Sequence, residues 1–261
     1  MSVTLPTIFT YQKALSFCSE FMTVYNAFGT KPTDEYAGYM DTMVSDLVSG
    51  GYWDRMDLFY VFANNIEANA LINWVNPGTF DADNVSSTSF TAYEGFTGDG
   101  SEDYISTNYN PSSDNTNYTL DNATVGIYLP ISQAEQSKYV FLATDGTNLL
   151  GLIPRQTAGN YVAFINSSLS MGGTFAASEG SGLWILTRTA SNVCVLYRDN
   201  TLIEQESDAS SSLPNAELGV LGNIGATYTT HQVSIFFVMN GVTAEEVSAI
   251  TTIINTYIAA L

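Results

Sequence analysis

The stretch that decides the fold is residues 182–204, GLWILTRTASNVCVLYRDNTLIE. Segments 183–187 and 193–197 are rich in β-branched and aromatic residues, while 190–192 and 199–200 supply turn residues between and after them. This pattern predicts a tight antiparallel meander. Apolar residues occupy both faces of the two runs, which is what an inner strand pair of a β-sandwich requires. The meander is therefore expected to lie in the core.

A resemblance to a known family rests on this stretch and two others. YRDN at 197–200 is similar to the Tyr-x-Asp-Gly turn of laminin G or concanavalin A-like jelly rolls, with Asn200 where Gly is usual. GFTGDG at 95–100, followed by YIST at 104–107, resembles the opening strand of such modules. IFF at 235–237 and GVTAEE at 241–246 resemble their closing strand and terminal helix. Together, over about residues 90–261, the chain is most similar to jelly-roll modules from structural proteins of tailed bacteriophages.

The resemblance and the residue pattern predict one fold class. We expect a mainly β protein, an antiparallel concanavalin A-like jelly-roll sandwich, preceded by a small α-helical N-terminal region and closed by a C-terminal helix. Residues 1–76 are expected to be a helical assembly or docking region, 77–92 an extended connector, and 93–261 the jelly roll with its terminal helix at 244–259. Thr243 and Glu246 have the spacing of a capping box at the start of that helix.

The N-terminal region shows helical periodicity. Apolar residues at helical spacing predict a helix over 8–28, and its apolar surface is wide enough to need more than one neighbour. Thr33 can cap a second helix that ends near Ser49, before Gly50-Gly51. The next apolar segment, 52–64, fits either a helix or a buried strand.

Composition limits the partners. Seven Lys and Arg against 26 Asp and Glu give a formal net charge of −19 in a chain of 261 residues, so nucleic acid is not expected as a partner. Between Asp34 and Asp103 the only basic residue is Arg55, which indicates either a solvated acidic face or a docking surface for a basic protein. Neither a signal peptide nor an apolar run long enough for membrane insertion is visible. The expected location is a virion assembled in the host cytoplasm.

The sequence offers few catalytic groups. His231 is the only histidine, no Gly-x-Ser-x-Gly elbow occurs, and Cys18 and Cys194 lack metal-ligand spacing, so they are expected to be buried, reduced thiols. Glu204-x-Glu206-x-Asp208 is the one carboxylate spacing that a glycoside hydrolase could use, but it runs into a serine-rich segment. We therefore predict no catalytic and no cofactor-binding residue.

Metal and sugar sites are harder to place. Asp99, Asp145 and Asp199 each lie beside Gly or Asn and are calcium candidates, although these dipeptides also form ordinary turns. Calcium is the only cofactor that the sequence suggests. A sugar site would use exposed aromatic residues, and several tyrosines lie near expected loops. These are Tyr109, Tyr118, Tyr161 and Tyr228.

The preferred functional hypothesis is a non-enzymatic structural protein of a phage virion. It would be a fibre, appendage or decoration component that displays its jelly roll for attachment to host-surface glycans. Its partners would be other virion proteins and copies of itself, with a trimer favoured because the first helix has excess apolar surface. One alternative is a carbohydrate-binding, lectin-like module at a cell surface. The other is a glycan-active hydrolase on the same fold.

Overall fold

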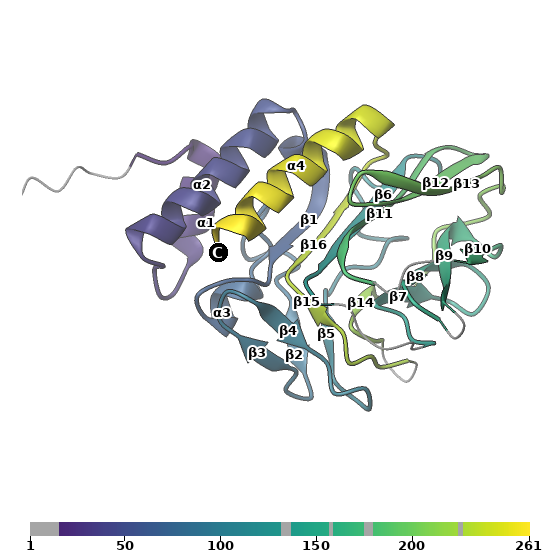
Figure 1. Ribbon diagram of the computed structural model, residues 1–261, viewed down its shortest axis with the longest axis horizontal. Helices are drawn as coiled ribbons and strands as arrows, with labels where there is room; N and C mark the ends of the chain where they lie inside the picture. The colour runs from purple at the N-terminus through teal and green to yellow at the C-terminus, as the bar shows by residue number, and fades with distance from the viewer. Residues whose placement is uncertain (1–15, 132–136, 157–158, 175–179, 224–226) are drawn as a thin grey trace, which may run out of the picture.

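The computed structural model describes residues 16–131, 137–156, 159–174, 180–223 and 227–261. Three layers succeed one another: a group of helices, a six-stranded sheet (sheet A) and a seven-stranded sheet (sheet B), with a small three-stranded sheet (sheet C) at one end (Figure 1). The expected class, mainly β with antiparallel sheets, helices at the N-terminus and one at the C-terminus, is confirmed.

Sheet A is antiparallel, in the order β1-β16-β6-β11-β12-β13. Its strands are β1 (Met56–Val61), β16 (Ile235–Met239), β6 (Ala123–Leu129), β11 (Gly182–Ala190), β12 (Val193–Arg198) and β13 (Thr201–Glu206). The first and the last strand of the sandwich in sequence, β1 and β16, are therefore neighbours.

Sheet B faces sheet A across the main core and has the order β10-β9-β8-β7-β14-β5-β2. Its strands are β10 (Met171–Thr174), β9 (Asn160–Ser167), β8 (Leu149–Ile153), β7 (Phe141–Thr144), β14 (Gly219–Val220), β5 (Tyr104–Ser106) and β2 (Asp83–Val85). Sheet C contains β15 (Gln232–Val233), β4 (Gly95–Thr97) and β3 (Ser89–Thr91).

The expected meander is the centre of sheet A. Trp184 and Leu186 of β11 belong to the core between the sheets, whereas Leu183 and Ile185 belong to a second core under the helices. The turn from β12 to β13 places Asp199 and Asn200 at φ 45° and 65°. Left-handed conformation at both central residues is what a two-residue hairpin turn requires, and Asp and Asn tolerate it well.

The helices cover the outer face of sheet A. They are α1 (Ser19–Ala27), α2 (Asp34–Ser49) and α4 (Ala244–Ala260), with a 3-10 turn η1 (Trp53–Arg55) before β1, whereas the one-turn α3 (Glu67–Ala70) lies near sheet C (Figure 1). In Figure 1, α2 and α4 lie side by side over β1 and β16. Side chains of α1, α2 and α4 share the second core with β1, β11 and β16. The helices and sheet A therefore form one packed unit.

Close packing of this core depends on a glycine in β6. A Cβ on Gly126 would lie 2.0 Å from the ring of Phe237, which is fully buried between β16 and the helices. Only glycine lets the Phe237 ring lie flat on the neighbouring strand.

Helix termini follow the sequence closely. The Thr33 hydroxyl accepts a hydrogen bond from the backbone N–H of Tyr36 at the start of α2. At the start of α4, Thr243 and Glu246 form the predicted capping box in both directions. The helix expected over 8–28 is shorter in its described part: α1 begins only at Ser19, after Cys18 in extended conformation, and residues 1–15 lie outside the described residues.

The ambiguous segment 52–64 is a strand. β1 pairs with β16 along its length, so sheet A begins before the boundary expected at Asn76. The segment expected as an extended connector, 77–92, contains β2, which pairs with β5, and β3, which pairs with β4. Hydrogen bonding to the sheets thus ties both segments to the sandwich.

Candidate functional site

A hollow with a cavity volume of about 290 Å³ lies where η1 and the start of β1 meet two loops, 75–80 and 114–117. Its apolar lining is Trp53, Met56, Val75 and Phe80. Its polar lining is Asp54, Asp57, Asn76, Asp114, Thr116 and Asn117. We call these ten residues the β1 pocket. An apolar floor with a few convergent polar groups is the usual composition of a small-molecule site.

Asp57 holds the pocket together. Its carboxylate accepts hydrogen bonds from the backbone N–H groups of Thr116, Asn117 and Tyr118, at 3.0, 2.8 and 3.0 Å. It also accepts one from the hydroxyl of Tyr109 at 3.0 Å. Burial, and secondarily the Asp57 charge, raise the pKa of Tyr109 well above its ordinary value, so this hydroxyl stays a donor. One side chain of β1 thereby fixes a loop about 60 residues away.

The aromatic floor is held by edge-to-face contacts. The Trp53 ring packs against Phe59 of β1, with centroids 5.9 Å apart. The Phe80 ring meets Tyr109 at 5.4 Å and nearly a right angle. Phe80 has φ 56°, and its carbonyl accepts a hydrogen bond from the buried Tyr60 hydroxyl. That bond holds the backbone in a conformation that a bulky residue seldom adopts.

Three polar side chains of the pocket are not engaged elsewhere. Asp54, Asn76 and Thr116 are exposed, and none of their side chains hydrogen-bonds within the described part of the chain. By contrast, the Asp114 carboxylate accepts from Asn110 and Ser113. The pocket therefore combines a rigid, internally bonded wall with donor and acceptor groups that are available to a ligand.

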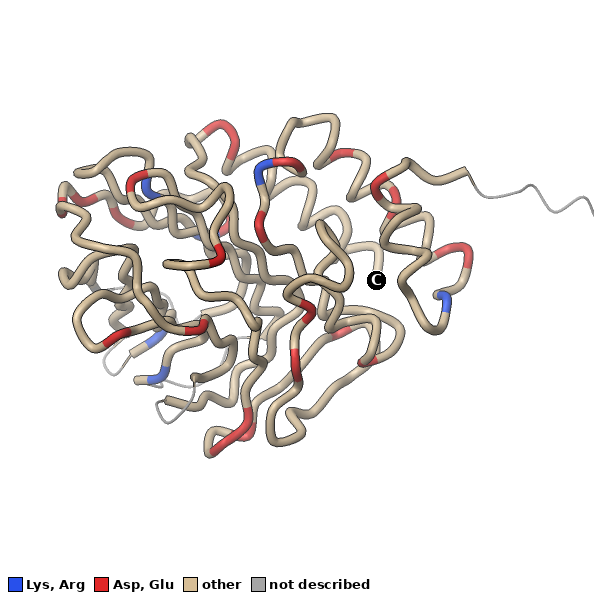
Figure 2. Tube along the Cα trace, turned by 180° about the vertical axis from the view of Figure 1, so that it is seen from behind, with Lys and Arg blue, Asp and Glu red and all other residues tan. Residues whose placement is uncertain are grey.

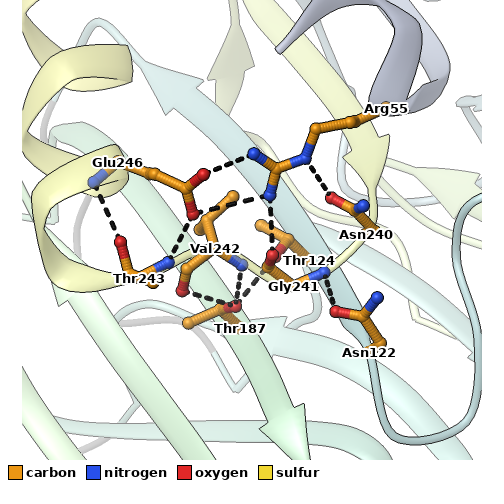
Figure 3. Close-up of polar contacts among 9 residues, drawn as sticks. All are labelled: Arg55, Asn122, Thr124, Thr187, Asn240, Gly241, Val242, Thr243 and Glu246. Carbon is orange, nitrogen blue, oxygen red and sulfur yellow. Dashed lines mark hydrogen bonds and ion pairs between the residues drawn. The ribbon is translucent and has the colours of Figure 1, made fainter. Parts of the chain in front are cut away.

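Arg55, the basic residue that follows Asp54 in the sequence, bonds to the connection between β16 and α4 (Figure 3). Its Nε donates to Asn240 Oδ1 at 2.8 Å, Nη2 donates to the Gly241 carbonyl at 2.9 Å, and Nη1 pairs with Glu246. Burial opposes ionisation of Glu246, but Arg55 and the backbone N–H of Thr243 lower its pKa overall.

The three calcium candidates lie in three different turns. Asp99 accepts from the backbone N–H groups of residues 101–103, and Asp145 from those of residues 147 and 148. The Ser101 hydroxyl, which also donates to Asp99, and the backbone bonds lower the pKa of Asp99 strongly, and the backbone bonds lower that of Asp145 to about 2. Asp199 accepts from the Leu183 N–H. Within the described ranges, no group of three or more His, Cys, Asp or Glu side chains could hold a metal ion, and calcium stays a prediction.

The histidine, the cysteines and two of the tyrosines considered as site residues lie mostly inside the protein. His231 is fully buried, with Nδ1 2.5 Å from the Thr229 hydroxyl, and burial lowers its pKa to about 4. Both cysteines are free thiols, as expected, and Cys194 is buried, but Cys18 is partly exposed, so its expected burial is wrong. Tyr109 and Tyr118 are fully buried core residues, so they offer no exposed face to a sugar.

The carboxylates of β13 do form a small cluster. The Tyr161 hydroxyl of β9 donates to Glu204 Oε2 at 2.7 Å. Glu204, through a hydrogen bond and its charge, raises the pKa of Glu206, its neighbour on the same strand face. Asp208 lies beyond the end of β13, where its carbonyl accepts from the buried Arg188.

Two further hollows of the described chain differ from the β1 pocket in their lining. One, of about 410 Å³, lies between the end of sheet A and α4 and is lined by Tyr128, Arg198, Asp199 and Asn255, among others. Its Arg198 Nε donates to the Ser181 carbonyl at 2.6 Å. The other is a groove of about 60 Å³ between α2 and α4. Neither pairs an aromatic floor with several unengaged polar groups.

The sequence did not point to the β1 pocket. Its residues come from three separate segments, 53–57, 75–80 and 114–117, and each segment looks like an ordinary turn or strand end. The one available signal was Asp57, an acidic residue inside the apolar run 52–64. A carboxylate in such a run needs several hydrogen-bond donors, and this requirement could have marked it as an anchor.

Comparisons with known proteins show the fold. No protein-family model and no curated protein sequence matches the chain. Among solved structures, the binding domain of botulinum neurotoxin serotype D matches with a TM-score of 0.56 and 11% identity, over 77% of this chain and 52% of that one. A Trypanosoma rangeli sialidase mutant with trans-sialidase activity matches at 0.55 and 11%, over 85% and 39%. Botulinum neurotoxin type C, whose passage into cells depends upon two ganglioside molecules, matches at 0.53 and 9%, over 77% and 52%.

These similarities concern architecture. At such low identity they show a shared β-sandwich fold and do not transfer residue roles. The chain spans about half of the toxin chains that it matches, or less than half in the sialidase. A phage origin and a laminin G relationship remain expectations from the sequence. None of the described helices is long and apolar enough to cross a membrane.

Proposed function

We propose that this chain is a non-catalytic carbohydrate-binding module whose ligand lies in the β1 pocket. The observation that carries the proposal is the pairing of an aromatic floor, Trp53 and Phe80, with three unengaged polar side chains, Asp54, Asn76 and Thr116. Apolar sugar faces pack on aromatic rings, and sugar hydroxyls need both donors and acceptors at the rim. Two of the sandwich neighbours, a neurotoxin binding domain and a neurotoxin whose cell entry depends upon two ganglioside molecules, support the same interpretation.

We further propose that the module serves attachment in the virion of a tailed phage. The support is the resemblance of segments 95–107, 182–204 and 235–246 to phage jelly rolls. In that setting its partners are other virion proteins and further copies of itself, a trimer being favoured, and the ligand is a host-surface glycan. Electron microscopy of phage particles labelled with an antibody to this chain tests this role, and an unlabelled particle argues against it.

A glycan array tests the binding function directly. The labelled full-length chain is expected to bind a limited set of glycans. The double variant Asn76→Ala and Thr116→Ala removes two hydrogen-bonding side chains and is expected to weaken binding about tenfold or more. Ser207→Ala, an exposed serine just after β13, is the matched control and should bind like the wild type. If the wild type binds no glycan, or the double variant binds equally well, the proposal is wrong.

The Tyr161–Glu204–Glu206 cluster gives a second candidate function. The raised pKa of Glu206 beside the Glu204 carboxylate is the property that a general acid needs in glycoside hydrolysis, where two neighbouring carboxyl groups share the chemistry. Hydrolysis of the glycans found on the array, followed by chromatography, tests it. Loss of cleavage in Glu204→Gln and Glu206→Gln, with binding kept, would favour a hydrolase. Absence of any cleavage by the wild type would leave the binding module alone.

A further inference from the structure

We infer that the β1 pocket prefers glycans that carry an amine over their neutral counterparts and discriminates against sialylated or other acidic glycans. The inference rests on the proposed function, and it concerns the charge of the ligand. Of the ten residues that line the pocket, Asp54, Asp57 and Asp114 carry carboxylates and none is Lys or Arg. A carboxylate on the ligand would therefore meet like charges and no cation.

Among the described residues that line the β1 pocket, no basic side chain is available to reverse this charge. Arg55 follows Asp54 in the sequence, but its three nitrogens are all bonded at the β16–α4 connection (Figure 3). Turning the guanidinium toward a ligand would break four hydrogen bonds and leave Glu246 without its partner. Figure 2 shows Asp and Glu spread over the chain with few Lys or Arg, so the background field has the same sign.

The three carboxylates of the pocket are not equivalent. Asp57 already accepts four hydrogen bonds, and Asp114 accepts two. Asp54 is exposed and accepts none within the described residues. A ligand amine would therefore pair with Asp54, because this is the carboxylate whose oxygens are free to accept. Neutral sugars would use the same oxygens as acceptors for hydroxyl groups, with less electrostatic gain.

The charge of the β1 pocket predicts a ligand preference that the fold neighbours do not. They include a sialidase and a neurotoxin that depends upon gangliosides. Similar architecture could suggest similar acidic ligands, whereas the charge of the β1 pocket predicts the opposite preference.

An array printed with matched glycans tests the inference. Each core is presented in neutral, amine-bearing and sialylated form, at about pH 6, where an amine is protonated. We expect the amine form to bind about twofold to fivefold more tightly than the neutral form, in keeping with one exposed ion pair. The sialylated form is expected to bind more weakly than both. Salt of about 0.5 M should reduce the difference.

Two variants locate the effect. Asp54→Asn keeps the size of the side chain and removes its charge, so the ratio of amine-form to neutral-form affinity should fall to about one, although the neutral form itself should bind more weakly because an acceptor oxygen is lost. Glu102→Gln, an exposed residue in another loop with the same change of charge, should keep the preference. Equal binding of neutral and amine forms, or tighter binding of sialylated forms, overturns the inference and leaves the binding function standing. If no form of any core binds, both fail.

Discussion

Among single residues, Arg55 does the most to join distant parts of the chain. Its guanidinium links η1 to Asn240, Gly241 and Glu246 across more than 180 residues of sequence. We expect Arg55→Met to lower the free energy of unfolding by about 1–3 kcal/mol, because it removes this set of bonds and leaves a half-buried Glu246 unpaired. Urea unfolding at pH 7 measures the change.

The control for Arg55 is Glu246→Gln, which keeps a capping-box side chain for Thr243 but no ion pair. It should cost less than Arg55→Met. The pKa of Glu246 is lowered in the folded protein, so its contribution is complete above the ordinary value of 4.5 and is lost as pH falls through the folded value. The difference between wild type and Arg55→Met should therefore shrink in acid. A difference that stays constant would contradict the ion-pair explanation.

His231 gives a second prediction for a single residue. Burial lowers its pKa from 6.5 to about 4, so the folded state stays neutral where the unfolded state takes up a proton. Stability attributable to neutral His231 is present above about pH 6.5 and declines as pH falls toward 4, by roughly 2 kcal/mol at about pH 5. His231→Gln should remove this decline between about pH 7 and pH 5. Urea unfolding at each pH measures the free energy of unfolding. The same decline in the wild type and in His231→Gln would contradict this role of His231.

Among the elements, the loop 114–118 depends on β1 more than on its own sequence. Asp57→Ala removes the acceptor for three backbone N–H groups, so amide exchange of residues 116–118 should accelerate about tenfold or more. Glycan binding should fall with it. The control is Asp83→Ala, because the Asp83 carboxylate accepts from the Asn108 side chain and, among the described residues, from no group of loop 114–118; this variant should leave that loop protected. Unchanged exchange in Asp57→Ala would show that the loop is held by other contacts.

Elements with a local pattern could be predicted from the sequence, and the site could not. The meander of β11 and β12 and the capping box of α4 follow from residues adjacent in sequence, and both are confirmed. The segment of β1 fitted a helix or a strand because LFYVF is apolar on both faces, and its pairing with β16 makes it a strand. The pocket depends on Asp57 meeting residues 116–118, a contact between distant segments that no local periodicity encodes.

At the scale of the whole molecule, the described helices cover their apolar faces within the chain. Phe21, Val24 and Phe28 of the first helical segment are almost fully buried, against Trp74 and neighbouring rings. The excess apolar surface that favoured a trimer is therefore satisfied internally, as far as the described residues go. Self-association stays a proposal that needs a measurement of its own.

That measurement is the solution mass of the full chain, together with that of residues 77–261, by light scattering. Removing residues 1–76 takes away β1, leaves β16 as a new sheet edge, and uncovers Phe237 and Ile185 where α1, α2 and β1 had packed. An exposed apolar edge of this kind promotes aggregation, so we expect the shorter chain to aggregate or to lack a cooperative unfolding transition. A soluble, cooperatively folded 77–261 would instead make the N-terminal segment a separable region. For the full chain, a trimeric mass supports assembly into an appendage, and a monomeric mass favours a free-standing binding module.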